Sequence, residues 1–335
     1  MRIGFSLLLI LPLAALPQRS IETLAGSGVA GFAPDQLNNP YGLVIGPDRA
    51  LYICDVDNHT VRRLDLRTRE LTTVAGNARQ GYAGDGGAAT DAALNQPYEV
   101  RFDNAGNMYF VEMRNHVVRR VDAKTRRIST VAGKGAPGFG GDGGPAREAQ
   151  LRNPHSIAFD AQGGLLICDI GNHRIRRVNL ATGIISTWAG TGEQKPTPDG
   201  ALLAGAPLNG PRAIDTDPLG NLYLALREGN AVFRIDAKSG RLNRLGGNTV
   251  WHGPKGIAWS GDGGLYVADT ESHTIRRIDL KTGAVTTVAG TGERGDGPDG
   301  DPLKCKLSRP HGVFAGPNGR IYIGDSENHR VRLLR

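Results

Sequence analysis

The sequence predicts an all-β chain folded as a six-bladed β-propeller, in which four-stranded antiparallel blades form a ring. A ten-residue pattern at 169–178, DIGNHRIRRV, has close copies at 55–64, 112–121, 269–278 and 325–334 and a divergent copy at 226–235. The chain also has 48 glycines but only 8 Phe, 8 Tyr and 3 Trp, which is typical of short strands joined by turns. These repeats indicate one propeller rather than two average domains, although the chain has 335 residues.

Each unit is expected to begin at a proline that is followed by a short apolar strand. Six prolines lie 57, 57, 57, 43 and 56 residues apart: Pro40, Pro97, Pro154, Pro211, Pro254 and Pro310. A turn such as 104–107 leads into a second strand, and the His-containing turn leads into a third. A fourth strand is predicted from a repeated ending such as LTTVAG at 71–76, because β-branched residues favour strands.

The sixth unit ends at Arg335, directly after its third strand. Residues 21–26, IETLAG, have the pattern of a fourth strand and lie ahead of the first unit. We therefore expect the N-terminal strand to complete the last blade. This pairing closes the ring and removes a sheet edge that would otherwise be open to another chain.

The chain divides into a predicted signal peptide at 1–17 and a propeller domain at 18–335. A charged start at Arg2, an apolar run at 3–11 and small residues near Ala15 follow the order that is typical of a secretory signal. The apolar run is too short to span a bilayer. The sequence therefore predicts a secreted or periplasmic protein with no transmembrane segment in the mature chain, and we expect a monomer.

The formal net charge of +7 is largely a property of the repeat. Ten arginines occupy two adjacent repeat positions, as Arg176 and Arg177 do. Because an Asp opens most copies, we expect pairing within blades rather than one basic patch. The predicted partners are Asp55, Asp169, Asp269 and Asp325.

The Asn-His pair followed by an aliphatic residue, with Asp before it and Arg-Arg after it, resembles the NHL repeat family. The resemblance covers essentially all of residues 18–335. It implies a six-bladed propeller, which is the architecture of that family. It does not imply one activity, because NHL propellers include protein-binding and RNA-binding modules, extracellular sensor domains and relatives that are enzymes.

The repeated histidines are expected to be structural. Five of six equivalent turns carry one, at His59, His116, His173, His273 and His329, and Asn230 takes the place in the fourth unit. A catalytic or metal site breaks the symmetry of a repeat and uses one to three side chains. We therefore expect each of these histidines to bond its own turn.

No cofactor is predicted, although calcium and zinc stay open as alternatives. The loop at 296–301 gathers three aspartates, but we favour an inter-blade turn there over a calcium site. Among enzymes that this propeller resembles, the peptidylglycine amidating lyases place metal-binding histidines after such a proline in three blades. Only His155 and His311 match here, so a three-His zinc site is not available from this set.

Ligands are expected at one mouth of the central channel, where the inner strands converge and the residue after each proline varies. The predicted ligand-binding residues are Tyr41, Tyr98, His155, Arg212, Lys255 and His311. Arg212 and Lys255 lie in neighbouring units, so an anionic or sugar-like group is favoured. A water-filled channel lined by the same residues is the alternative.

The sequence favours a non-enzymatic module that binds a protein or carbohydrate partner, with an acidic partner as one option. The repeats are regular, and no complete catalytic set is present, so we assign no catalytic residue. A metal-assisted lyase or lactonase working in the channel is the alternative. Nucleic-acid binding is a third option, which the positive charge keeps open and the predicted signal disfavours.

Overall fold

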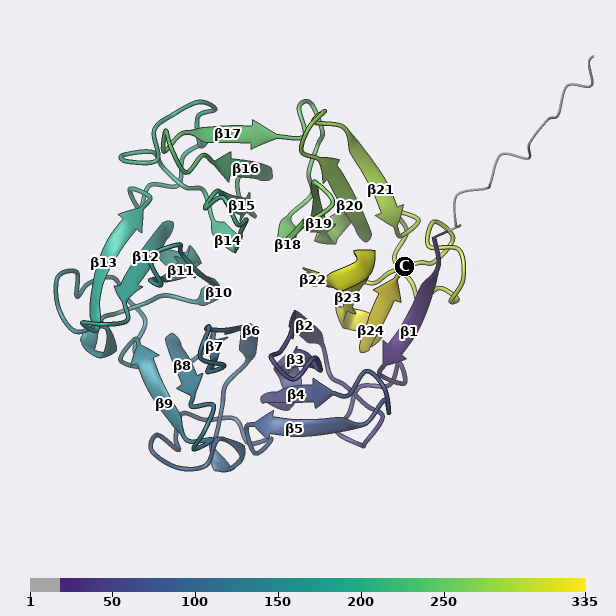
Figure 1. The fold of residues 1–335 in the computed structure, drawn as a ribbon, viewed down its shortest axis with the longest axis horizontal. Coiled ribbons are helices and arrows are strands. Elements are labelled where there is room, and N and C mark those ends of the chain that lie inside the picture. The colour runs from purple at the N-terminus through teal and green to yellow at the C-terminus, as the bar shows by residue number, and fades with distance from the viewer. Residues whose placement is uncertain (1–18) are drawn as a thin grey trace, which may run out of the picture.

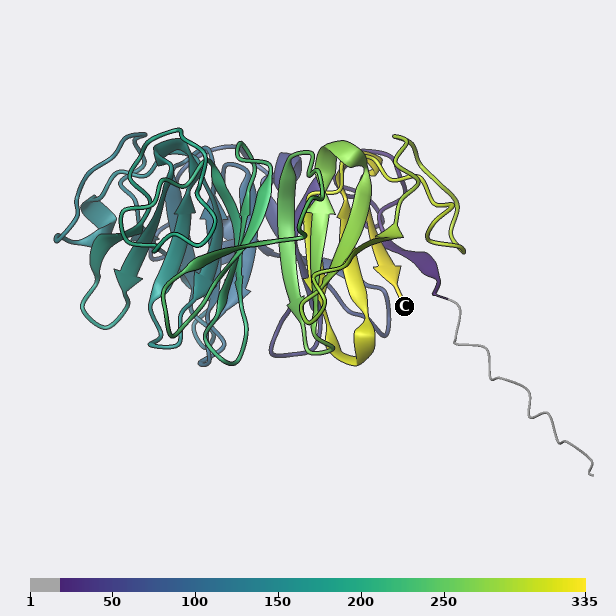
Figure 2. The same ribbon diagram turned by 90° about the horizontal axis from the view of Figure 1, so that it is seen from above.

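The computed structural model describes residues 19–335 and contains six antiparallel sheets of four strands around one axis (Figure 1). Viewed from the edge, the ring is a disc, and the strands run between its two faces (Figure 2). The predicted fold class is therefore confirmed. The signal peptide predicted at 1–17 lies outside the described residues. Within 19–335, no helix is both long and apolar enough to cross a membrane.

The blades are numbered along the chain and written from the inner strand outward. Blade 1 contains β2 (Pro40–Ile45), β3 (Leu51–Asp55), β4 (Thr60–Leu64) and β5 (Leu71–Ala75), and blade 2 contains β6 (Pro97–Phe102), β7 (Met108–Glu112), β8 (Val117–Val121) and β9 (Ile128–Ala132). Blade 3 contains β10 (Pro154–Phe159), β11 (Leu165–Asp169), β12 (Arg174–Asn179) and β13 (Ile184–Ala189), and blade 4 contains β14 (Pro211–Thr216), β15 (Leu222–Leu226), β16 (Ala231–Ile235) and β17 (Leu242–Leu245). Blade 5 contains β18 (Pro254–Ser260), β19 (Gly264–Asp269), β20 (Thr274–Asp279) and β21 (Val285–Ala289), and blade 6 contains β22 (Gly312–Ala315), β23 (Ile321–Asp325), β24 (Arg330–Leu334) and β1 (Ile21–Ala25). Short 3-10 helices are η1 (Val56–Asn58), η2 (Ala89–Asp91), η3 (Ala146–Glu148), η4 (Ile170–Asn172), η5 (Thr270–Ser272), η6 (Pro317–Gly319) and η7 (Ser326–Asn328).

The apolar core lies between neighbouring blades rather than inside any one of them. In one cluster, Cys54 and Val61 of blade 1 pack with Val100 and Phe110 of blade 2. A middle strand is therefore buried on both faces, as all five residues of β3 are. Strands of this kind read as continuous apolar runs, which explains why the second strand of each unit is so apolar.

The N-terminal strand closes the ring, as predicted. β1 pairs with β24 in an antiparallel ladder that sets Ile21 opposite Leu334. The backbones of Ser20 and Arg335 exchange two further hydrogen bonds of 3.2 and 2.8 Å. Ile21 and Leu24 are buried in the closed blade, so this strand contributes apolar packing as well as hydrogen bonds.

A buried ion pair repeats from blade to blade, as the charge pattern predicted. The first arginine of each Arg-Arg position lies beside the carboxylate that ends the second strand, as Arg332 Nε does at 3.1 Å from Asp325. Blades 1, 3 and 5 contain the same pair, and blade 2 uses Arg119 and Glu112 at 2.8 Å. In blade 4 both partners are replaced by apolar residues, Leu226 and Phe233. Loss of both partners together avoids an unpaired buried charge.

The repeated histidines connect blades, so the expectation that each bonds its own turn was wrong. The Nδ1 of His173 accepts a hydrogen bond of 3.2 Å from the backbone N–H of Gly210, which precedes the first proline of blade 4. The other four histidines make the equivalent bond to the next blade. Asn230 does the same with Oδ1, at 2.8 Å from the backbone nitrogen of Gly253. These six bonds form a continuous belt around the ring.

Deleting residues 19–26 is expected to lower the free energy of unfolding by at least about 4 kcal/mol, because Ile21 and Leu24 each lose about 2 kcal/mol of apolar burial. Thermal and urea unfolding measure the change. The control is a chain that begins at residue 19. Equal stability of the two chains would show that β1 does not close the ring.

Replacing His173 with Ala is expected to cost about 1–2 kcal/mol, because the bond to the next blade is lost and the residue has φ of 51°. His173→Asn is expected to retain most of the stability, since Asn tolerates this backbone and Asn230 already supplies the acceptor in blade 4. Urea unfolding compares the two variants. An equal loss in both would contradict the role assigned to the side-chain acceptor.

Candidate functional site

The structure brings the six predicted site residues into contact at the axis. Each follows its proline at the inner end of a blade, and we call the six the axial ring: Tyr41, Tyr98, His155, Arg212, Lys255 and His311. Tyr41 stacks on His311 with ring centroids 3.9 Å apart and meets Tyr98 edge-on at 4.6 Å. Tyr98 in turn contacts His155 at 4.5 Å. All but Tyr41 are buried, so these side chains pack against one another at this level of the channel.

The two ring histidines are neutral hydrogen-bond acceptors. The Nδ1 of His155 lies 2.6 Å from the carbonyl oxygen of Asn153, and the Nδ1 of His311 lies 2.8 Å from that of Arg309. A carbonyl can only accept, so each Nδ1 carries the proton and each Nε2 is left as an acceptor. Burial lowers the pKa of His155 to about 3 and also lowers the pKa of His311.

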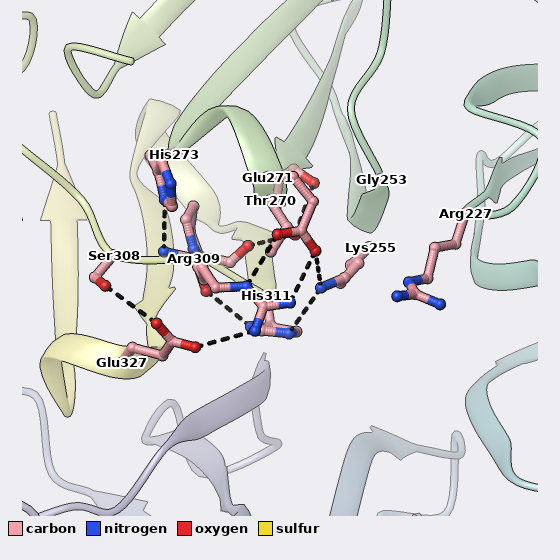
Figure 3. Close-up of polar contacts among 12 residues, drawn as sticks. Arg227, Gly253, Lys255, Thr270, Glu271, His273, Ser308, Arg309, His311 and Glu327 are labelled. Carbon is pink, nitrogen blue, oxygen red and sulfur yellow. Dashed lines mark hydrogen bonds and ion pairs between the residues drawn. The ribbon is translucent and has the colours of Figure 1, made fainter. Parts of the chain in front are cut away.

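Lys255 has an internal partner, which the prediction of an anionic ligand beside Arg212 and Lys255 did not include. Its Nζ lies 2.7 Å from Oε1 of Glu271 and 3.3 Å from Nε2 of His311 (Figure 3). Burial lowers the pKa of Lys255 to about 8. Although burial opposes it, hydrogen bonds from Arg309 and Lys255 lower the pKa of Glu271 to about 2. The pair is therefore ionised at neutral pH.

Arg212 has no such partner. Its guanidinium lies 4.6 Å from the centroid of the Tyr98 ring and donates to the Tyr98 hydroxyl. Only 5% of the residue is exposed, its Nε has no hydrogen-bond partner, and no ion pair joins it to a carboxylate within 19–335. Burial lowers its pKa, and the charge of Arg227 contributes to the same shift. Arg212 is thus a buried cation that feels the positive charges of Arg227 and Arg309 and the negative charge of Glu228, and none of these groups forms an ion pair with it within 19–335.

Four further side chains extend the site, and the sequence reasoning missed them: Arg227, Glu271, Arg309 and Glu327. Arg309 donates to Glu271 at 2.8 and 3.0 Å and to Glu327 at 3.0 Å. Arg227 turns its guanidinium toward Lys255 in Figure 3. The residue before each proline differs between units, just as the residue after it does. A search for such differences at the preceding position would have found Arg309.

The donors that could hold a metal are already used. Below the axial ring, the guanidinium of Arg101 lies against Glu99 and close to Asp215, so a protein cation neutralises these carboxylates. In the loop at 296–301, Asp296 and Asp299 bond Arg332 at 2.5 and 2.9 Å, so the loop makes the inter-blade contact that the sequence favoured. Within 19–335, no three His, Cys, Asp or Glu side chains gather as metal ligands would.

The chain is similar to parts of longer proteins, and it spans 16% of one such relative and 40% of another. It is 32% identical to Protein SUPPRESSOR OF QUENCHING 1, chloroplastic, from Arabidopsis thaliana over 174 residues, which cover 49% of this chain and 16% of the relative. It is 27% identical to NHL repeat-containing protein 2 from Homo sapiens over 290 residues, covering 74% of this chain and 40% of the relative.

Solved structures share the fold. An auxiliary nutrient binding protein from Bacteroides thetaiotaomicron superposes with a TM-score of 0.68 at 16% identity, covering 95% of this chain and 76% of that one. Virginiamycin B lyase from Staphylococcus aureus superposes with a TM-score of 0.57 at 16% identity, covering 95% of this chain and 99% of that one. Residues 99–332 match the family described as SMP-30/Gluconolactonase/LRE-like region. The chain belongs to this family of propellers, and its repeats are of the NHL type.

Proposed function

We propose that the protein is a non-enzymatic binding propeller whose axial ring holds the anionic group of a sugar acid or of an acidic partner. The supporting observation is Arg212, a buried guanidinium with no carboxylate partner within 19–335. We further propose that the protein acts outside the cytoplasm, in the secreted or periplasmic setting that the sequence of 1–17 favours.

An anion at Arg212 would relieve an electrostatic cost. A buried charge without a partner is unfavourable, and a carboxylate that accepts two guanidinium hydrogen bonds compensates it in a water-poor site. Lys255 and Arg227 lie near enough to affect the charges of the ring, so a second oxygen of the ligand would also meet positive potential. Tyr41, the one axial-ring residue that is not buried, supplies an aromatic side chain of the kind that packs against a sugar.

A lactonase or lyase is the second candidate, because the matched family includes gluconolactonase in its name. The observed side chains support it less well, because Arg101 takes the position beside Glu99 where a cation would bind and the two ring histidines contact different tyrosines. Metal analysis separates the candidates. Stoichiometric zinc or calcium that survives dialysis would favour the enzyme.

Replacing Arg212 with Met is expected to weaken gluconate binding at least tenfold, about 1.4 kcal/mol, because the charged hydrogen bonds are lost. The same variant is expected to raise the free energy of unfolding of the ligand-free protein by about 1 kcal/mol, because it removes an unpaired buried charge. Calorimetry measures binding, and urea unfolding measures stability. Glucose is the neutral ligand control, and Lys238→Met, which removes an exposed charge, is the variant control. Unchanged affinity in Arg212→Met would move the site away from the ring.

Gluconate affinity is expected to fall as the pH rises from 7 to 9.5. Lys255 has a pKa of about 8, so raising the pH through this value removes its proton and its positive charge from the ring. Calorimetric titrations across this range measure the change. In Lys255→Met the decline below about pH 8.5 should largely disappear, because burial lowers the pKa of Arg212 only to about 9 and the charge of Arg212 is lost at higher pH. A decline of equal size in both proteins would assign the titration to another group.

A further inference from the structure

Inter-blade loops supply a second carboxylate to the buried arginines of blades 2, 3 and 6, but not to Arg62 of blade 1. The loop before blade 2 places Asp85 so that one oxygen lies 2.8 Å from Nη2 of Arg119 and the other accepts from the backbone N–H of Thr130 at 3.0 Å. Thr130 lies opposite Arg119 on the outer strand. Asp142 joins Arg176 to Thr187 in blade 3 at 2.6 Å each, and Asp299 joins Arg332 to Thr23 in blade 6 at 2.9 Å each.

Blade 5 lacks this loop. The step from Pro211 to Pro254 is 43 residues where the preceding three steps are 57, and β17 is joined to β18 by residues 246–253 alone. Arg276 of blade 5 still pairs with Asp269 at 3.2 Å, but its side chain is 20% exposed whereas the side chains of Arg119 and Arg176 are 0% exposed. Arg276 Nη1 also donates to the carbonyl oxygen of Val250 at 2.9 Å. No side-chain hydrogen bond within 19–335 reaches Thr287, the residue opposite Arg276.

A cavity of about 580 Å³ lies where the missing loop would be, and we call it the blade 5 pocket. Its lining includes Ser272, Thr274, Arg276 and Thr287. In blade 3 the residues equivalent to Ser272 and Thr274 are Asn172 and Arg174, and both hold the loop. Asn172 donates to the carbonyl of Gly138 at 2.7 Å, and Arg174 stacks on Phe139 at 4.0 Å. In blade 5 the Ser272 hydroxyl turns back to Asp269 at 2.8 Å. The Thr274 hydroxyl is buried without a partner.

We propose that the blade 5 pocket binds an aspartate side chain on an extended peptide segment of a partner protein. The groups that hold a loop carboxylate in blades 2, 3 and 6, a guanidinium and the threonine opposite it, are present in blade 5 without that carboxylate. The occupant of the equivalent space elsewhere is a peptide carrying an Asp, so a peptide of the same chemistry fits the geometry best. An arginine with a second carboxylate forms the stronger, charge-assisted type of hydrogen bond.

The charges around the pocket are compatible with an anion. Glu271 also lines the cavity, but its carboxylate is held by Lys255 and Arg309. Leu303, at the rim, is 54% exposed and offers an apolar contact to a residue next to the aspartate. The blade 5 pocket adjoins the axial ring through Glu271, which pairs with Lys255, but no axial-ring residue lines the pocket. The proposal does not depend on the function proposed for that ring.

The test is a titration of the isotope-labelled protein with the capped peptide acetyl-Gly-Asp-Gly-Leu-amide, followed at the backbone amide of Thr287 by NMR. The Asp peptide is expected to shift this amide, as the loop aspartate contacts the amide of Thr130. The same peptide with Asn in place of Asp is expected to leave it unchanged. Stronger binding of acetyl-Gly-Gly-Leu with a free terminal carboxylate would overturn the assignment to a side chain, and no shift at Thr287 with any of the peptides would overturn the proposal.

Matched variants locate the binding. Arg276→Gln is expected to lower the affinity for the Asp peptide at least tenfold. Arg62→Gln, which removes the equivalent arginine of blade 1, should leave the affinity for this peptide unchanged. Thr287→Val is expected to weaken binding severalfold if the hydroxyl also contacts the ligand, as Thr187 contacts Asp142. Thr187→Val is the control, which should lower the melting temperature without affecting the peptide. Full affinity in a folded Arg276→Gln variant and in Thr287→Val would overturn the proposal.

Discussion

Five of the six blades place an arginine of the third strand beside a buried carboxylate, and in four of them the guanidinium is buried as well. A cation removed from water must be neutralised nearby. The carboxylate that ends the second strand meets this need within the blade. Desolvation is nevertheless the dominant cost, since burial raises the pKa of Asp55 and Asp169 to about 6 even beside their arginines. The inter-blade loops then add a second carboxylate in three blades, so the same constraint explains the pattern of the strands and the aspartates of the loops. Blade 4 meets the constraint differently, because Leu226 and Phe233 remove both charges.

The other repeated interactions join neighbouring blades to one another. A side-chain acceptor from each third-strand turn reaches the backbone that precedes the next inner strand, and β1 supplies the last ladder. These contacts use the histidine, the asparagine and the terminal strand, but not the residue that follows each proline. The axial positions are therefore free to differ between blades without weakening the ring, which is why their chemistry is informative about function.

The axis combines neutral and charged groups in a way that packing alone does not require. His155 and His311 are held in one tautomer by backbone carbonyls, and Lys255 is balanced by Glu271. Arg212 is the exception, since it is buried among cations and aromatic faces. We expect this side chain to make the free protein less stable, and this expectation is the basis of the binding site proposed for the axial ring.

The sequence alone determined the number of blades, the strand order, the closure of the ring and the convergence of six residues on the axis. Each of these follows from periodicity, because equivalent positions of a repeat occupy equivalent places in a ring. Tertiary structure decided the partners: His173 reaches the next blade rather than its own turn, Lys255 meets Glu271, and Arg212 meets no carboxylate within 19–335. Such contacts depend on the distance between blades and on the direction of individual side chains, which residue spacing does not encode. The short step from Pro211 to Pro254 was visible in the sequence, but only the packed blades show that it leaves Arg276 partly exposed beside a cavity.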